Sequence, residues 1–126
     1  MTQRKILVIE DNEQNMYLMH FLLEKNGYHV NEALSGPQGI LSARNDRPDI
    51  ILLDIQLPEM DGYAVAKELR RTPGLETIPI IAVTSYAMAG DRERILAAGA
   101  TDYIEKPVNP LTFVDQIKIH FTGDEK

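Results

Sequence analysis

The sequence contains no cysteine. The chain therefore forms neither a disulfide framework nor a metal site with thiolate ligands. Its three histidines, His20, His29 and His120, show no spacing typical of metal ligands, and we expect them on the surface or on helix faces. The absence of cysteine is compatible with a reducing compartment, and we expect a cytoplasmic protein.

A long apolar segment is also missing. The N-terminal stretch "MTQRKILVIEDN" places basic residues before an apolar run, but Glu10 and Asp11 interrupt that run before it reaches the length of a signal peptide. We therefore expect neither secretion nor a membrane span.

An excess of positive charge is missing too, because the net charge is −6. Such a chain offers no basic face to the phosphate backbone of a nucleic acid, so direct nucleic-acid binding is not expected. The glycine-rich loops that bind nucleotide or dinucleotide phosphates are absent as well.

The length and composition are those of one globular domain. The chain has 126 residues, of which 44% are hydrophobic and 25% are charged, values near the averages of globular proteins. We expect a single domain over residues 1–126, in which residues 122–126 form a polar tail and no output domain follows.

Short apolar runs of strand length recur along the chain. The strongest are KILVI (5–9), DIILL (49–53) and IPIIAV (78–83), and weaker ones are YHVNEA (28–33) and DYIE (102–105). Because these runs are continuous rather than alternating, we expect both faces of their sheet to be covered.

Segments with helical spacing lie between the apolar runs, and each should bury one stripe. The first helix shows this spacing at Met16, Met19 and Leu23, and the last, which should finish near Phe121, shows it at Leu111, Val114, Ile117 and Phe121. Glycine and proline occur where the helices should end. Strand and helix therefore alternate five times, which predicts an α/β fold with a doubly wound parallel sheet.

Polar residues follow the predicted strands where each strand ends. Glu10 and Asp11 follow the first, Asp54 the third, Thr84 and Ser85 the fourth, and Lys106 with Pro107 the fifth. Because the carboxyl ends of parallel strands share one edge, we expect these side chains to be neighbours. Two carboxylates about 4 Å apart repel by on the order of 4 kcal/mol in a medium of effective dielectric near 20. A hard divalent cation such as Mg²⁺ would offset this repulsion, so the edge predicts a magnesium pocket.

Ordinary structural roles compete with this interpretation. Asp11 could cap the first helix, Thr84 or Ser85 could cap the fourth, and Lys106 could be an exposed surface charge. Asp54 is harder to explain in that way, because Asp61 lies closer to the start of the next helix and is the better cap.

The cluster is suited to phosphoryl transfer, in which catalysis is mostly positioning and neutralisation of charge. Asp54 is the candidate nucleophile. Lys106 would stabilise the phosphoryl oxygens, Thr84 could donate a hydrogen bond to one of them, and Glu10 with Asp11 would hold the ion.

Four motifs carry a resemblance to a known family: VIEDN (8–12), LLDIQLPEMDG (52–62), AVTSYA (82–87) and YIEKP (103–107). Over essentially its whole length the sequence resembles the receiver domain of two-component response regulators, in its stand-alone, single-domain form. The resemblance implies a flavodoxin-like, five-stranded parallel sheet of order 2-1-3-4-5 with five helices. The pattern of apolar runs does not by itself define this strand order.

The resemblance also implies roles for individual residues. Asp54 corresponds to the phosphoacceptor, and Asp11 with Glu10 to the acidic pair, Glu10 acting through a water molecule. The backbone carbonyl of Gln56 would complete a site for Mg²⁺ or Mn²⁺. The peptide bond between Lys106 and the next residue, Pro107, is expected to be cis.

A conformational switch is implied as well. Tyr103 corresponds to the family's switch aromatic, which turns inward when the Thr84 hydroxyl moves onto the phosphoryl group; the alternative is an ordinary half-buried strand tyrosine. The reporting surface would be the last two helices and the strand at 102–105 between them.

As a receiver, the protein would take its phosphoryl group from a histidine kinase or a phosphotransfer protein and then bind a downstream protein target. It would act as a monomer or as a phosphorylation-dependent dimer. It would be a signalling switch that catalyses its own phosphorylation and dephosphorylation rather than an enzyme with an external substrate.

Two positions depart from the family members that cycle rapidly, which carry small or acidic side chains where this chain has Gln56 and Tyr86. We hypothesise that Tyr86 crowds the path of the attacking water and slows hydrolysis. Gln56 also bears on one alternative, a haloacid-dehalogenase-type phosphatase, because an amide there cannot serve as the general acid. The other alternative, a pseudo-receiver that only binds partners, is disfavoured by the complete set of acidic residues and lysine.

Overall fold

The computed structural model describes residues 3–85 and 89–121, and within them five strands alternate with five helices. The strands are β1 (Lys5–Ile9), β2 (His29–Ala33), β3 (Ile50–Asp54), β4 (Ile80–Thr84) and β5 (Asp102–Glu105). The helices are α1 (Glu13–Lys25), α2 (Gly36–Asn45), α3 (Gly62–Arg71), α4 (Ala89–Ala97) and α5 (Phe113–Lys118). The strands form one parallel sheet of order β2-β1-β3-β4-β5, which confirms the predicted fold class.

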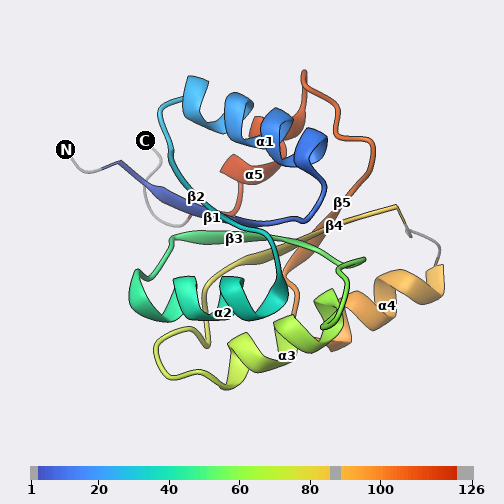
Figure 1. Cartoon of the computed structure of the whole chain (residues 1–126). Helices are drawn as coiled ribbons and strands as arrows, with labels where there is room; N and C mark the ends of the chain where they lie inside the picture. The colour runs from blue at the N-terminus through green and yellow to red at the C-terminus, as the bar shows by residue number, and fades with distance from the viewer. Residues whose placement is uncertain (1–2, 86–88, 122–126) are drawn as a thin grey trace.

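Two helical layers cover the sheet, with α1 and α5 on one face and α2, α3 and α4 on the other (Figure 1). Successive residues of a strand point to opposite faces of the sheet. Ile6 and Val8 of β1 therefore pack on the side of α1 and α5, and Leu7 and Ile9 pack on the side of α2, α3 and α4. Every residue of β3 is buried. The continuous apolar runs in the sequence are therefore explained by burial on both faces.

Side-chain caps fix the start of three helices. Asn12 accepts a hydrogen bond from the backbone N–H of Asn15 at the start of α1, and Ser35 caps α2 in the same way. Asp61 caps α3, as the sequence predicted. Two competing caps were wrong: Asn12, not Asp11, caps α1, and Thr84 is the last residue of β4. The cap suggested at Ser85 stays untested, because residues 86–88, which lead into α4, lie outside the described residues.

The last helix differs from its prediction. Leu111 was expected on the buried stripe but is 88% exposed, because a turn over Asn109 precedes the helix and α5 begins only at Phe113. Ile117 is buried as predicted, together with Phe113, while Val114 and Phe121 are partly buried against the same core. α5 ends at Lys118 rather than near Phe121.

Two strand boundaries also differ slightly from the prediction. β3 begins at Ile50 and includes Asp54 as its last residue, whereas the apolar run ended one residue earlier. β4 begins at Ile80, after Pro79, which has no N–H to donate to a neighbouring strand. The consequence for the site is that Asp54 belongs to a strand whose residues are all buried.

Close packing under α3 holds the chain that follows Asp54. The backbone N–H of Gly62 donates to the carbonyl of Ile55 at 3.0 Å. A Cβ atom at Gly62 would lie 2.5 Å from Ile55 Cα and 2.6 Å from the backbone oxygen of Asp54. Both atoms belong to the backbone, so any side chain at this position would have to move the loop beside Asp54.

We therefore expect Gly62→Ala to lower the free energy of unfolding by about 1–3 kcal/mol, the usual range for overpacking. Denaturant titration measures this value. Gly90→Ala is the matched control, since it also lies at the start of a helix but its Cβ would meet no described atom within 4 Å. The control should be neutral or slightly stabilising. Equal losses in the two variants would contradict the steric explanation.

Candidate functional site

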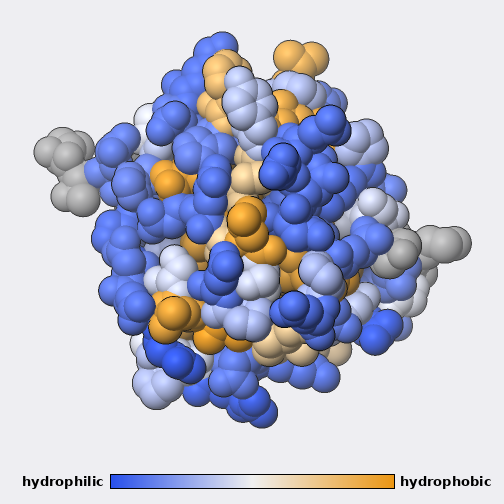
Figure 2. Space-filling view, viewed as in Figure 1, coloured by the Kyte–Doolittle hydropathy of each residue, from blue (hydrophilic) through white to orange (hydrophobic). Residues whose placement is uncertain are grey.

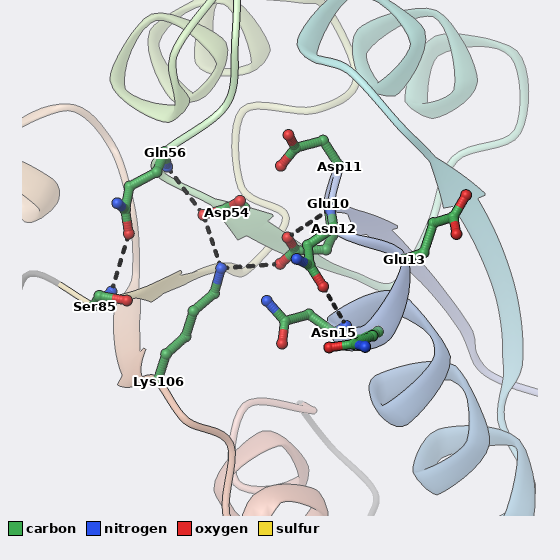
Figure 3. Close-up of a pocket in the computed structure, with 10 residues that line it drawn as sticks. Glu10, Asp11, Asn12, Glu13, Asn15, Asp54, Gln56, Ser85 and Lys106 are labelled. Carbon is green, nitrogen blue, oxygen red and sulfur yellow. Dashed lines mark hydrogen bonds and ion pairs between the residues drawn. The ribbon is translucent and has the colours of Figure 1, made fainter.

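Three carboxylates meet at the carboxyl edge of the sheet (Figure 3). Glu10 follows β1, Asp54 ends β3, and one oxygen from each of Glu10, Asp11 and Asp54 lies within 4.8 Å of the other two. The exposed fraction is 0% for Glu10 and 2% for Asp54, whereas Asp11 is exposed. The convergence predicted from the strand ends is therefore present.

Lys106, the residue after β5, reaches the same point from the opposite side (Figure 3). Its Nζ atom lies 3.2 Å from Glu10 Oε1 and 3.3 Å from Asp54 Oδ1. The backbone N–H of Lys106 donates to the Thr84 carbonyl at 2.8 Å, and its peptide bond to Pro107 is cis. Lys106 is thus a largely buried ammonium shared by two buried carboxylates, not a surface charge.

Gln56 connects Asp54 to the neighbouring strand. Its backbone N–H donates to Asp54 Oδ1 at 2.9 Å, which fixes the orientation of the carboxylate. Its side-chain Oε1 accepts a long hydrogen bond, 3.4 Å, from the backbone N–H of Ser85 after β4. Gln56 therefore lies at the site where the sequence placed it, between the end of β3 and the end of β4.

Glu10 carries the electrostatic imbalance of the cluster. Burial, followed by the nearby charge of Asp54, raises its pKa from 4.5 to about 7, although Lys106 and the backbone N–H of Asn12 act in the opposite direction. Its Oε1 atom is buried and accepts no hydrogen bond from the described residues; its contact there is the ion pair with Lys106. One ammonium does not balance the carboxylates around it.

These residues fit a hard divalent cation. They supply carboxylate oxygens from three residues, including the buried Oε1 of Glu10, which accepts no hydrogen bond from the described residues and is contacted by the Lys106 ammonium. They surround an open cleft of about 600 Å³, in which a bound ion could keep several water molecules. This donor set matches Mg²⁺ or Mn²⁺ and excludes a site built on soft ligands.

Thr84 and Tyr103 are not among the residues that line the cleft. Thr84 is fully buried at the end of β4, and the next residue, Ser85, lines the cleft instead. Tyr103 is half-buried on β5, opposite Ala82 of β4, and packs on the core between the sheet and α2, α3 and α4. Tyr86, to which we assigned slow hydrolysis, lies outside the described residues.

The sequence reasoning missed one wall of the cleft. Asn12, Glu13, Gln14 and Asn15, at the start of α1, line it together with the residues predicted. The signal was present as an unbroken polar run after the first strand, since a helix that starts directly after a strand end must present its first turn at the same edge.

Comparison with known proteins places the chain in context. Residues 6–118 match the family model described as "Response regulator receiver domain". The chain is 44% identical to the polar-differentiation response regulator DivK of Brucella anthropi over 121 residues, which are 96% of this chain and 98% of that protein. The DivK of Brucella melitensis is equally similar, at 44% identity over the same shares.

Solved structures show the same similarity to receiver domains. The receiver domain of a sensor histidine kinase from Pseudomonas aeruginosa, described with a magnesium ion coordinated in its active site cleft, superposes with a TM-score of 0.87 at 36% identity, covering 98% of this chain and 100% of that one. The chemotaxis protein CheY4 of Vibrio cholerae superposes with a TM-score of 0.91 at 26% identity, covering 94% and 99%. Among the helices in the described part of the chain, none is long and apolar enough to cross a membrane.

The raised pKa of Glu10 predicts how stability depends on pH. Because this pKa is higher in the folded state, the folded protein binds more protons than the unfolded chain between pH 4.5 and about 7, and it loses stability as pH rises through this window. In metal-free buffer, we expect the free energy of unfolding of the wild type to fall relative to that of Glu10→Gln by on the order of 2–3 kcal/mol. Denaturant titrations across the window measure the difference. A difference that stays constant with pH would contradict the assignment.

Repulsion within the cluster predicts a second effect. Adding Mg²⁺ to about ten times its dissociation constant should raise the melting temperature of the metal-free protein by about 5 °C, because a ligand of the folded state adds stability. Asp54→Asn should raise it in the absence of metal, because one of the repelling charges is removed. NaCl at matched ionic strength controls for screening. If neither treatment raises the melting temperature, the carboxylates do not repel one another appreciably.

Proposed function

The chain belongs to the response regulator receiver family, and from this premise we propose that it is a phosphoryl-accepting switch of a two-component system or phosphorelay. The donor is a phosphohistidine on a histidine kinase or on a phosphotransfer protein. The acceptor is Asp54. The observation that carries this proposal is the position of Lys106 Nζ, 3.2 Å from Glu10 and 3.3 Å from Asp54, beside an acidic cluster suited to a divalent ion.

The transfer is a displacement at phosphorus. A carboxylate oxygen of Asp54 forms a bond to phosphorus while the bond between phosphorus and the donor's imidazole nitrogen breaks, and the electron pair stays on that nitrogen. Hydrolysis of the acyl phosphate by water later regenerates the carboxylate and releases phosphate. The protein catalyses both steps on itself and transforms no external substrate.

The cleft supplies the residues that position this reaction. Asp11 and Asp54 are the carboxylates that would hold Mg²⁺ or Mn²⁺, together with Glu10 through a water molecule and the backbone carbonyl of Gln56. When bound, the ion neutralises negative charge on the phosphoryl oxygens. The backbone N–H of Gln56 already orients Asp54, so the nucleophile is fixed before a phosphoryl donor arrives.

Lys106 and Thr84 complete the site on the other side. The Lys106 ammonium leaves Glu10 or Asp54 to contact a phosphoryl oxygen, and the Thr84 hydroxyl moves toward the cleft to donate a hydrogen bond to another. Thr84 is buried beside the cleft in this structure, so its movement changes the packing around it. Tyr103, which follows this movement by turning inward, reports it.

The output is a change in protein binding. The surface made by α4, β5 and α5 contains Tyr103 and is the part of the molecule expected to bind a downstream protein target. A phosphoryl group adds nearly two negative charges and strong hydrogen-bond acceptors at Asp54, which is enough to shift an element that has two arrangements. The active form is a monomer or a phosphorylation-dependent dimer.

Treatment with acetyl phosphate and Mg²⁺ tests the proposal. We expect one hydroxylamine-labile phosphoryl group per chain, detected by intact mass and mapped to Asp54. Asp54→Asn should remove it, and EDTA should prevent its formation. Asp115→Asn, which changes an exposed carboxylate on α5, should be labelled like the wild type.

The outcome separates the alternatives. A wild type that acquires no label under these conditions while binding Mg²⁺ would favour a pseudo-receiver, which binds partners without phosphorylation. Labelling that persists in Asp54→Asn would show that another residue is the acceptor.

A further inference from the structure

α4 is anchored at its C-terminal end by Arg70 of α3. The Nε atom of Arg70 donates to the carbonyl of Gly99, two residues after α4, at 2.8 Å. Its Nη atoms donate to the carbonyl of Ile78 at 2.7 Å and to Thr101 Oγ1 at 3.3 Å, and further to the carbonyls of Leu75 and Glu76. One guanidinium therefore ties the end of α4 to the starts of β4 and β5.

The N-terminal half of α4 is held much less firmly. Arg92, Glu93 and Arg94 are exposed, and Ile95 is the first side chain of α4 that is buried among those described. α4 lies at the margin of the lower helical layer, beside α3 (Figure 1). Because burial supplies most of the stabilisation of a packed helix, the side chains described from Gly90 to Arg94, none of which is buried, contribute mainly through contacts at the surface.

Two cation–π contacts connect α4 to its neighbours on opposite sides. The guanidinium of Arg92 lies over the ring of Tyr103 of β5, 5.4 Å from its centroid, and that of Arg94 lies over Tyr63 of α3, 4.1 Å from its centroid. Residues two apart on a helix point about 200° apart, so the arginines reach opposite flanks. Ile95 points between them into the core.

The two tyrosines pack on the same core. Both rings are half-buried against the cluster between the sheet and α2, α3 and α4. The arginines therefore link the surface half of α4 to rings that are themselves fixed in the interior. A displacement of Tyr103 or of α4 must break the Arg92 contact, and a displacement of α4 from α3 must break the Arg94 contact.

We propose that Arg92 and Arg94 form a cation–π clasp that holds α4 and Tyr103 in the unphosphorylated arrangement and so sets how readily the protein switches. Arg92 is the positioning residue for Tyr103, and α4 turns about the end fixed by Arg70 when the clasp opens. This inference rests on the proposed function, because it describes what resists the phosphorylation-dependent movement.

The strength of such contacts sets the expected effect. An exposed cation–π contact stabilises the arrangement that contains it by a factor of about two to five. If the contact is absent from the phosphorylated arrangement, its loss increases the population of that arrangement by the same factor. The apparent affinity for a ligand that binds this arrangement then rises equally, as long as the arrangement remains a minor one.

Titration with beryllofluoride, an analogue of the phosphoryl group, in the presence of Mg²⁺ tests the clasp. We expect Arg92→Gln to lower the dissociation constant by about two- to fivefold. The loss of a positive charge should by itself raise the dissociation constant, because it weakens the attraction for the beryllofluoride anion. Arg92→Lys, which keeps the cation, should stay close to the wild type, and Arg44→Gln on α2 controls for charge at another exposed position.

A double-mutant cycle assigns the effect to the ring. Arg92→Gln should have no effect in a Tyr103→Leu background, whereas Arg94→Gln should retain its effect there and lose it with Tyr63→Leu. A wild type that ignores beryllofluoride would overturn the proposed function and the clasp together. The clasp alone would be overturned if the wild type binds beryllofluoride but Arg92→Gln has the wild-type dissociation constant, or binds more weakly than Arg44→Gln.

Discussion

The contact between Lys106 and two buried carboxylates is the interaction on which the rest of the site depends. Glu10 and Asp54 have almost no exposed surface, so water screens neither charge. Burying an ionised group is unfavourable unless a partner compensates it, and here a single ammonium serves both. The negative charge of the site is consequently only partly compensated. Burial raises the pKa of Glu10 to about 7, and its Oε1 atom accepts no hydrogen bond from the described residues beside its ion pair with Lys106. A fold that maintains this arrangement maintains an affinity for positive charge.

The sheet is what makes this arrangement possible. Asp54 is carried by β3, which lies between β1 and β4 and is buried along its whole length, so the carboxylate cannot move away from Glu10 without disturbing the core. Gln56 fixes its orientation, and the close approach of Gly62 fixes the loop beyond it. Repulsion that flexible surface residues would relieve by moving apart is thus retained, because rigid neighbours determine the positions of the charges.

The sequence predicted the parts of this structure that follow from strong local patterns. Continuous apolar runs identify strands buried on both faces, and polar residues directly after them identify the shared edge. Strand order was available only through the resemblance, because periodicity does not distinguish one neighbour from another. Leu111 was misplaced because helical spacing continued through a turn that Asn109 creates. The wall formed by the first turn of α1 was missed because its residues are ordinary polar side chains, which gain a role only from the position of the helix.

The firmness with which each element is held differs across the molecule, and the difference follows from burial. The strands that carry Glu10 and Asp54 are buried, whereas the first half of α4 rests on contacts made by exposed arginines. In the switch that we propose, a charge change at Asp54 would meet rigid surroundings at the cluster itself and would be relieved at the less firmly held edge around α4. Since cation–π contacts at exposed positions contribute only about 0.5–1 kcal/mol each, they are weak enough to be broken by one covalent modification and strong enough to weight two arrangements. A rigid charged site and a lightly held helix within one domain are the two parts that the proposed switch requires, and both follow from which side chains are buried.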